Sequence, residues 1–262
     1  MSGRLALALA LSLGPAVWAA DAVAVARPTS PDARAVAWMR DSLEYAAVST
    51  EVYRSGLRYV RQFAKKHPGL RNWCVILDID DTVLTTVPFR AEEAGRPFEW
   101  CRWEKWVQGH YFKPVPGAKE FLDGVRRLPG AHVVFLTDRR PVILERTRAN
   151  LERDGLWGKG DLLIGQDSPA DTKQKRRRDC VERAIDPRCK AAGPMTIAAL
   201  FGDQVLDFKF LRGNDVAKAR SEIIRNGGWD PRYFVLPNPT YGAWTRGYAA
   251  KKWRAQGWGT CP

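Results

Sequence analysis

The stretch Val75-Ile76-Leu77-Asp78-Ile79-Asp80-Asp81-Thr82 decides the fold, because an apolar run leads directly into three acids. The apolar part, residues 74–77, is typical of a strand that is buried on both faces. Three carboxylates at one strand end repel one another unless a cation or a protonation change compensates their charge. On its own such a stretch is also compatible with an acidic turn or a helix cap, so the other strand ends must decide its role.

Further β-rich runs follow along the chain and alternate with helical patterns. This alternation predicts an α/β fold, with a Rossmann-like parallel sheet and helices on both of its faces. The expected strands are residues 74–77, 133–136, 162–164, 197–201 and 233–236, and the expected helices are residues 118–128, 142–153, 174–184 and 216–225.

Two regions extend this core. Ser30-Pro31-Asp32 is a helix start, and apolar residues recurring every three to four positions over 36–63 predict an N-terminal extension of one long or two shorter helices. The interval 83–130, between the first two strands, is longer than a crossover requires and is rich in aromatic residues. We therefore expect it to contain a small cap insert over the carboxyl end of the sheet, where ligands of open α/β sheets bind.

Polar residues also follow other expected strands. Thr137 comes directly after the strand at 133–136, and Gly202-Asp203 ends the strand at 197–201, with Asp207 four residues later. Lys173 opens a basic helix, for which a solvated charged face is the simpler interpretation. Each segment is weak evidence alone, but all of them occur in one order at strand ends.

That ordered set resembles the haloacid dehalogenase (HAD) superfamily of phosphohydrolases. The hhhhDxDxT motif of the superfamily matches at Asp78, Asp80 and Thr82, and its GDxxxD motif matches at Asp203 and Asp207. Its strand-ending Ser/Thr matches Thr137, and its Lys matches Lys173. Within the superfamily, the run 86–89, the WxxW at 103–106 and the run 236–244 look like the exported bacterial acid phosphatases of class C and their class B relatives. These include lipoprotein 5′-nucleotidases, whose lipidated cysteine is absent here.

The resemblance implies an acid phosphatase that hydrolyses phosphate monoesters, with nucleoside monophosphates as expected substrates. It implies that Asp78 attacks phosphorus and forms an aspartyl-phosphate, while Asp80 protonates the leaving group and later activates water. Thr137 and Lys173 would bind the phosphoryl oxygens. The implied cofactor is Mg²⁺, held by the side chains of Asp78 and Asp203, the backbone carbonyl of Asp80, and Asp207 directly or through water.

Substrate choice would fall to the aromatic cap. Phe89, Trp103 and Tyr241 align with family positions that lie against the nucleotide base or another flat leaving group, and such stacking tolerates different bases. Arg139 lies two residues after Thr137 and is a further candidate for substrate binding.

The N-terminus is typical of a secretory signal, with an apolar stretch over 5–13 and a small-residue cleavage site near Ala20. The alternative is a membrane anchor, but the stretch is shorter than the roughly 20 residues that span a bilayer. We expect residues 1–20 to be a signal peptide and 21–262 to form a single phosphatase domain, located in the periplasm or secreted, with no membrane anchor after cleavage.

Five cysteines follow this signal, so at least one is unpaired. Cys180 and Cys189 flank a short segment and are the best candidates for a local disulfide, with Cys101 and Cys261 a weaker second pair. Cys74 lies in an apolar strand and is expected to be a buried thiol.

The formal net charge of +13 favours an anionic partner. One alternative is therefore a nucleic-acid-binding protein that uses the basic run 173–178. A second is a catalytically silent phosphatase-like binding protein, although such a protein would need neither Asp78 nor Asp80. We expect a small phosphorylated substrate and no stable nucleic-acid complex, and the sequence leaves a homo-oligomer open.

Overall fold

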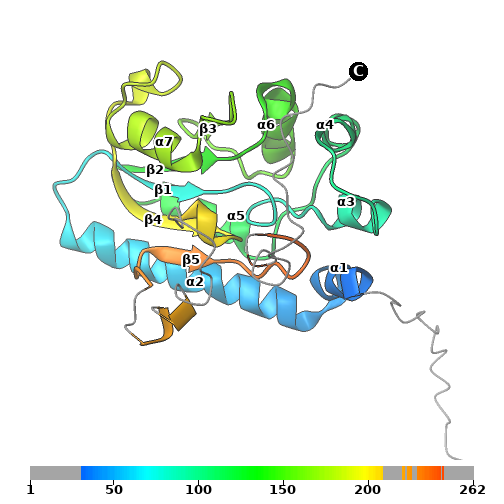
Figure 1. Ribbon diagram of the computed structural model, residues 1–262. Coiled ribbons are helices and arrows are strands. Elements are labelled where there is room, and N and C mark those ends of the chain that lie inside the picture. The colour runs from blue at the N-terminus through cyan, green and yellow to red at the C-terminus, as the bar shows by residue number, and fades with distance from the viewer. Residues whose placement is uncertain (1–30, 209–219, 222, 226–228, 243, 245–262) are drawn as a thin grey trace, which may run out of the picture.

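The computed structural model describes residues 31–208, 220–221, 223–225, 229–242 and 244. The centre of the fold is a five-stranded, all-parallel sheet with the strand order β3-β2-β1-β4-β5 (Figure 1). The predicted α/β architecture is confirmed, and each expected strand is matched to within two residues at both ends. The strands are β1 (Trp73–Leu77), β2 (Ala131–Leu136), β3 (Leu162–Ile164), β4 (Thr196–Gly202) and β5 (Tyr233–Val235).

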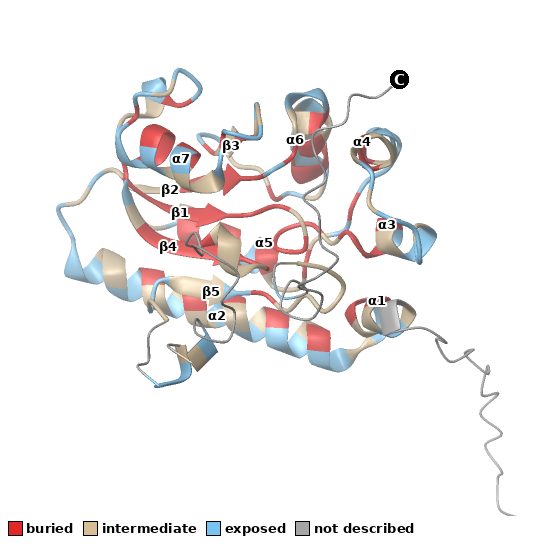
Figure 2. Cartoon of the chain, in the orientation of Figure 1, coloured by how far each residue is buried: buried red, intermediate tan, exposed pale blue. Residues whose placement is uncertain are grey.

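Both faces of the sheet are covered, because alternate strand residues enter two different hydrophobic clusters. In β1, Val75 and Leu77 belong to the larger cluster, whereas Cys74 and Ile76 belong to the smaller one. Figure 2 shows β1 and most of β4 buried between the helices, whereas the edge strand β5 is only partly buried. The helices α2 (Leu43–Lys66) and α5 (Ala118–Arg126) cover one face, and α7 (Lys173–Arg176) with the π-helical turn Arg177–Glu182 covers the other.

The N-terminal extension forms two helices rather than one. The helix α1 (Pro31–Asp41) ends before Ser42, whose hydroxyl accepts a hydrogen bond from the Tyr45 amide at 3.0 Å and so caps α2. Tyr53 of α2 is buried and donates its hydroxyl proton to the Thr82 carbonyl at 2.5 Å. The extension is thereby attached to the loop that follows β1. The helix-starting Ser30 lies outside the described residues.

The cap insert is present between β1 and β2. It consists of α3 (Val87–Glu92) and α4 (Trp100–Gly109), which lie at the end of the sheet toward which the strands point (Figure 1). After the cap, α5 returns the chain to the start of β2. The remaining helix that follows β2 is α6 (Leu144–Arg153), preceded by a 3₁₀ turn at Pro141–Ile143.

Two expected helices differ from the structure. The helix expected at 174–184 is α-helical only to Arg176 and continues as the π-helical turn, which buries Asp179, Cys180 and Val181 in succession. Three consecutive inward-facing residues do not fit a regular α-helical stripe, which accounts for the wider turn. Half of the helix expected at 216–225 lies outside the described residues, and the described positions 220–221 and 223–225 are helical.

The cysteines follow the predicted pattern where the structure describes them. Cys180 and Cys189 form a disulfide, and Cys74 is a buried free thiol, as predicted. Cys101 is also disulfide-bonded, and its expected partner Cys261 lies outside the described residues. Residues 1–20, with the expected cleavage site, lie outside them too. In the described part of the chain, no helix has both the length and the apolar character needed to cross a membrane.

Candidate active site

The predicted site residues meet at one edge of the sheet, because they follow parallel strands. Asp78 comes directly after β1, Thr137 directly after β2, and Asp203 directly after β4. The strand pairing continues into these positions, since the Asp78 amide donates to the Phe201 carbonyl and the Thr137 amide to the Ile164 carbonyl, each at 3.0 Å. The backbone at the strand ends is therefore fixed by the sheet itself.

Lys173 joins this group from another element. Thr172 caps α7 by accepting a hydrogen bond from the Lys175 amide, which places Lys173 in the first turn. Its ammonium donates to Asp78 Oδ1 at 2.5 Å and to Asp207 Oδ1 at 2.6 Å. Burial alone would lower the pKa of Lys173, but the carboxylates of Asp207 and Asp78 raise it well above its usual value. Lys173 therefore stays protonated between the two acids.

Three carboxylates form a compact group, which we call the carboxylate cluster: Asp78, Asp203 and Asp207. One oxygen from each lies within 4.8 Å of the others. Burial, opposed by Lys173 and reinforced by Asp207, raises the pKa of Asp78 to about 8. Burial, reinforced by the carboxylates of Asp207 and Asp78, also raises the pKa of Asp203 well above its usual value. One ammonium does not balance three carboxylates, so the cluster suits a divalent cation with oxygen ligands.

The backbone at Gly202 packs closely against Asp207 of the carboxylate cluster. Asp207 Oδ2 accepts a hydrogen bond from the Gln204 amide at 2.9 Å, which folds the 3₁₀ turn Val205–Asp207 back against β4. A methyl group on Gly202 would lie only 2.4 Å from Asp207 Cβ. Asn238, which follows β5, donates to Asp203 Oδ2 at 2.7 Å. These contacts orient two of the three carboxylates.

The Asp80 side chain lies apart from the cluster and pairs with Arg139. The guanidinium donates to Asp80 Oδ1 through Nη2 at 2.6 Å, and through Nε to both carboxylate oxygens at 3.2 Å. Arg139 is only 1% exposed, donates to Thr147 Oγ1 at 2.8 Å, and packs against the rings of Trp103 and Phe112. In this structure Arg139, a candidate for substrate binding, uses Nε and Nη2 to bond the carboxylate of Asp80.

Three supporting residues were missed by the sequence reasoning. Asp81 is fully buried with a φ of 54° and accepts hydrogen bonds from the Thr86 amide and hydroxyl, which turns the chain from the motif loop into α3. Asn238 lies in the run 236–244, and the resemblance assigns it no role of its own. Arg176 is fully buried and donates to the Thr137 carbonyl and the Asp138 carboxylate. Its spacing of three residues from Lys173, on one helix face, was the available signal.

The basic run 173–178 is largely used inside the molecule. Lys173 and Arg176 are buried in the contacts described above, and Arg177 donates to the Phe208 carbonyl at 2.6 Å. Arg178 pairs with its neighbour Asp179 at 2.8 Å. The solvated-face interpretation is therefore wrong for Lys173 and Arg176, whereas the side chains of Lys175 and Arg178 are 49% and 56% exposed and pair with Asp179.

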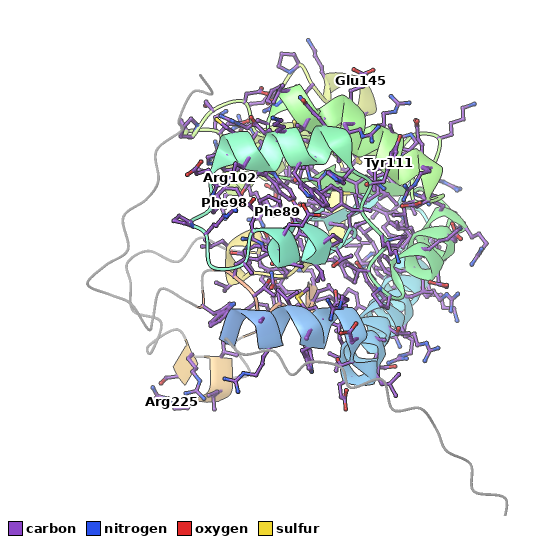
Figure 3. The ribbon with its side chains drawn as sticks, turned by 90° about the vertical axis from the view of Figure 1, so that its right-hand side faces the viewer. Phe89, Phe98, Arg102, Tyr111, Glu145 and Arg225 are labelled. Carbon is purple, nitrogen blue, oxygen red and sulfur yellow. A yellow bond between two sulfur atoms is a disulfide. The ribbon has the colours of Figure 1, made fainter. Side chains whose placement is uncertain are left out.

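The cap aromatics pack mainly on one another. Phe89 and Trp103 are 2% and 4% exposed, with ring centroids 4.8 Å apart in an edge-to-face arrangement. Both rings belong to the core of the cap in this structure, and their stacking on a base stays a prediction. Figure 3 shows Phe89 and Phe98 between α3 and α4. Tyr241, by contrast, is half-buried in the loop that follows β5.

Comparisons with known proteins agree with this geometry. The family model of the HAD superfamily, subfamily IIIB (acid phosphatase), matches residues 13–244. Two solved structures of the class C acid phosphatase from Bacillus anthracis, one of them with tungstate bound, are similar to this chain. Each is 23% identical, with a TM-score of 0.69, and the match covers 86% of this chain and 91% of theirs. At this identity the structural likeness establishes the shared fold.

The family match spans most of the chain, including every segment that contributes to the carboxylate cluster. The chain therefore belongs to the HAD superfamily subfamily IIIB acid phosphatases, and it is a phosphomonoesterase.

Proposed function

We propose that this enzyme hydrolyses phosphate monoesters through an aspartyl-phosphate on Asp78, with Mg²⁺ bound at the carboxylate cluster. The observation that carries the proposal is the position of Asp78 at the end of the central strand, bonded to Lys173 and within 4.8 Å of two further carboxylates. In the proposal Asp78 is the nucleophile, and it lies beside a fixed cation, Lys173, and beside carboxylate oxygens that would hold a metal ion. Charge neutralisation and positioning are the main requirements of phosphoryl transfer.

The first step is attack of an Asp78 oxygen on phosphorus. A bond forms between that oxygen and phosphorus, the bond from phosphorus to the leaving-group oxygen breaks, and Asp80 supplies the proton to the departing oxygen. In the second step Asp80 takes a proton from water, and the resulting hydroxide attacks phosphorus and releases Asp78. Arg139 holds the Asp80 carboxyl in a fixed place for both transfers.

The phosphoryl oxygens are bound by groups that are already oriented. Lys173 carries a fixed positive charge at the nucleophile, and the buried Thr137 hydroxyl accepts a hydrogen bond from the Arg139 amide at 3.2 Å. Arg176 fixes the Thr137 backbone from behind. Tungstate is a tetrahedral oxyanion like phosphate, and its presence in one of the similar solved structures supports an oxyanion site in this fold.

The residues present fit a divalent metal. Asp78, Asp203 and Asp207 supply carboxylate oxygens within 4.8 Å of one another, and burial together with the neighbouring acids raises the pKa values of Asp78 and Asp203. A bound Mg²⁺ ion would neutralise charge between these acids and an incoming phosphate. Oxygen ligands with room for water are typical of Mg²⁺ sites.

We further propose nucleoside monophosphates as substrates and a periplasmic or secreted location. Tyr241 is a candidate for stacking on a base, because it is half-buried and lies three residues from Asn238, which bonds Asp203. The disulfide between Cys180 and Cys189 is typical of proteins that fold in an oxidising compartment.

The test is phosphate release at pH 5 to 6 from 5′-nucleotides, 3′-nucleotides and p-nitrophenyl phosphate, with Mg²⁺ or with EDTA. We expect metal-dependent turnover that Asp78→Asn reduces by at least about 1,000-fold. The matched control is Asp123→Asn, which removes a half-exposed carboxylate that bonds Lys119 on α5. Turnover retained in Asp78→Asn would contradict the covalent mechanism, and no turnover from folded wild-type protein would favour a catalytically silent binding protein.

A further inference from the structure

The side chain of Arg90 differs from those of the other arginines around the active site in making no hydrogen bond or ion pair with any described residue. Its buried Nε lacks an acceptor in this part of the chain. Its neighbours in the cap are paired instead, since Arg102 bonds Glu93 at 2.8 Å and Arg140 bonds Glu104. A buried donor without an acceptor is unfavourable and rare in folded proteins.

Aromatic rings hold Arg90 in place. Its guanidinium carbon lies 4.0 Å from the ring centroid of Tyr241, 5.6 Å from that of Phe98 and 5.7 Å from that of Phe89. Cation–π contacts of this kind use the flat faces of the rings and the positive charge of the guanidinium. They do not use its N–H donors, which point along the guanidinium plane and remain available to an acceptor.

The position of Arg90 connects the cap with the catalytic centre. It belongs to α3, whose N-cap residue Thr86 donates its amide proton to Asp81 Oδ1 of the motif loop at 2.7 Å. On its other side it contacts Tyr241, from the loop whose Asn238 bonds Asp203 of the carboxylate cluster. Burial and the carboxylates of Asp81 and Asp203 raise the pKa of Tyr241, whereas Arg90 acts in the opposite direction. Arg90 therefore stands at the border between the cap and the acids.

We propose that Arg90 is a specificity-determining residue that binds a second anionic group, a carboxylate or phosphate, on the leaving group of the phosphate monoester. The inference rests on the proposed hydrolysis at Asp78 and adds the class of substrate. A planar guanidinium with free in-plane donors matches the paired oxygens of a carboxylate or a phosphate. The acids of the cluster would repel such a group, so an unpaired cation at the border of the cap is what a doubly anionic substrate requires.

The experiment compares substrate pairs that differ by one anionic group. The first pair is adenosine 3′,5′-bisphosphate and adenosine 5′-monophosphate, and the second is 3-phosphoglycerate and glycerol 3-phosphate. Release of the phosphate from the shared position is followed, and the ratio of kcat/KM within each pair is determined for wild type, Arg90→Gln and Arg90→Lys. The two pairs separate a phosphate from a carboxylate as the bound group.

We expect wild type to favour the more anionic member of at least one pair, and Arg90→Gln to lower that ratio by about 10- to 100-fold. Arg90→Lys keeps the charge without the planar donors and should restore part of the ratio. The matched control is Arg96→Gln, because Arg96 is a cap arginine whose side chain is 64% exposed and pairs only with Glu93. Its ratios should equal those of wild type.

Several results would overturn the assignment. Equal losses for both members of each pair in Arg90→Gln, with a lowered Tm, would make Arg90 a structural link between α3 and Tyr241. Unchanged ratios in both Arg90 variants would show that no anionic group binds there. A wild-type enzyme that hydrolyses none of these substrates or p-nitrophenyl phosphate would instead refute the proposed function.

Discussion

Replacing Gly202 by alanine tests whether Asp207 must lie where the structure places it. The added Cβ would lie 2.4 Å from Asp207 Cβ and 2.4 Å from Asp207 Oδ2, whereas ordinary contact begins at 3.4 Å. Asp207 must then move by about 1 Å, since the atom struck is next to its backbone and cannot rotate away. A displacement of this size in a positioned group lowers kcat/KM by about 100-fold.

The assay is kcat/KM for p-nitrophenyl phosphate as a function of Mg²⁺ concentration. We expect Gly202→Ala to need more Mg²⁺ for half-maximal activity, because a ligand of the carboxylate cluster is displaced, while circular dichroism shows a folded chain. Gly109→Ala is the matched control, since no atom lies within 4 Å of its added methyl group. Activity within about threefold of wild type, with the same Mg²⁺ dependence, would refute the reasoning.

Three further outcomes are expected. The first concerns Arg188, which bonds the carboxylates of Asp171 and Asp186. Burial alone would raise the pKa of Asp171, but the bonds from Arg188 act against it, and that pKa is lowered. The same arginine lowers the pKa of Asp186. Such bonds stabilise the fold at pH values above the unfolded pKa of about 3.9. Arg188→Gln should therefore lower the free energy of urea unfolding by roughly 2 kcal/mol at pH 7, and by less as the pH falls below about 4. A loss that does not change with pH would contradict this. Arg176→Gln removes the donor to the Thr137 carbonyl and should weaken inhibition by tungstate by about tenfold, with Arg176→Lys recovering part; unchanged inhibition would count against the positioning role. Saturating Mg²⁺ at about 100 times its Kd should add about 2.7 kcal/mol to the free energy of unfolding relative to EDTA, and identical melting curves would argue against the metal site.

The sheet and the polar residues that meet at its edge could be predicted because their signals are local. A buried parallel strand is a short apolar run, and the polar residue that ends it is read directly from the sequence, as with Asp78 after β1 and Asp203 after β4. The separation into two N-terminal helices depended on a single hydroxyl, that of Ser42, and a periodic apolar pattern does not report it.

The supporting residues could not be predicted because their partners are chosen by tertiary structure. Arg176 belongs to the same basic run as Lys173, yet Lys173 bonds Asp78 whereas Arg176 bonds the backbone of Thr137. Likewise, aromatic density predicted the cap but not which rings stay accessible, because the burial of Phe89 and Trp103 depends on their packing against each other.

The strand order has a consequence for how the enzyme matures. The two residues joined by the bond from Lys173 to Asp78 are 95 positions apart, and Asp203 reaches them only when β4 has paired with β1. Pairing over such separations is slow compared with formation of the N-terminal helices. A newly synthesised chain is thus inactive until its central strands have paired. The rate at which phosphatase activity recovers during refolding consequently reports how fast β1 and β4 pair at the centre of the sheet.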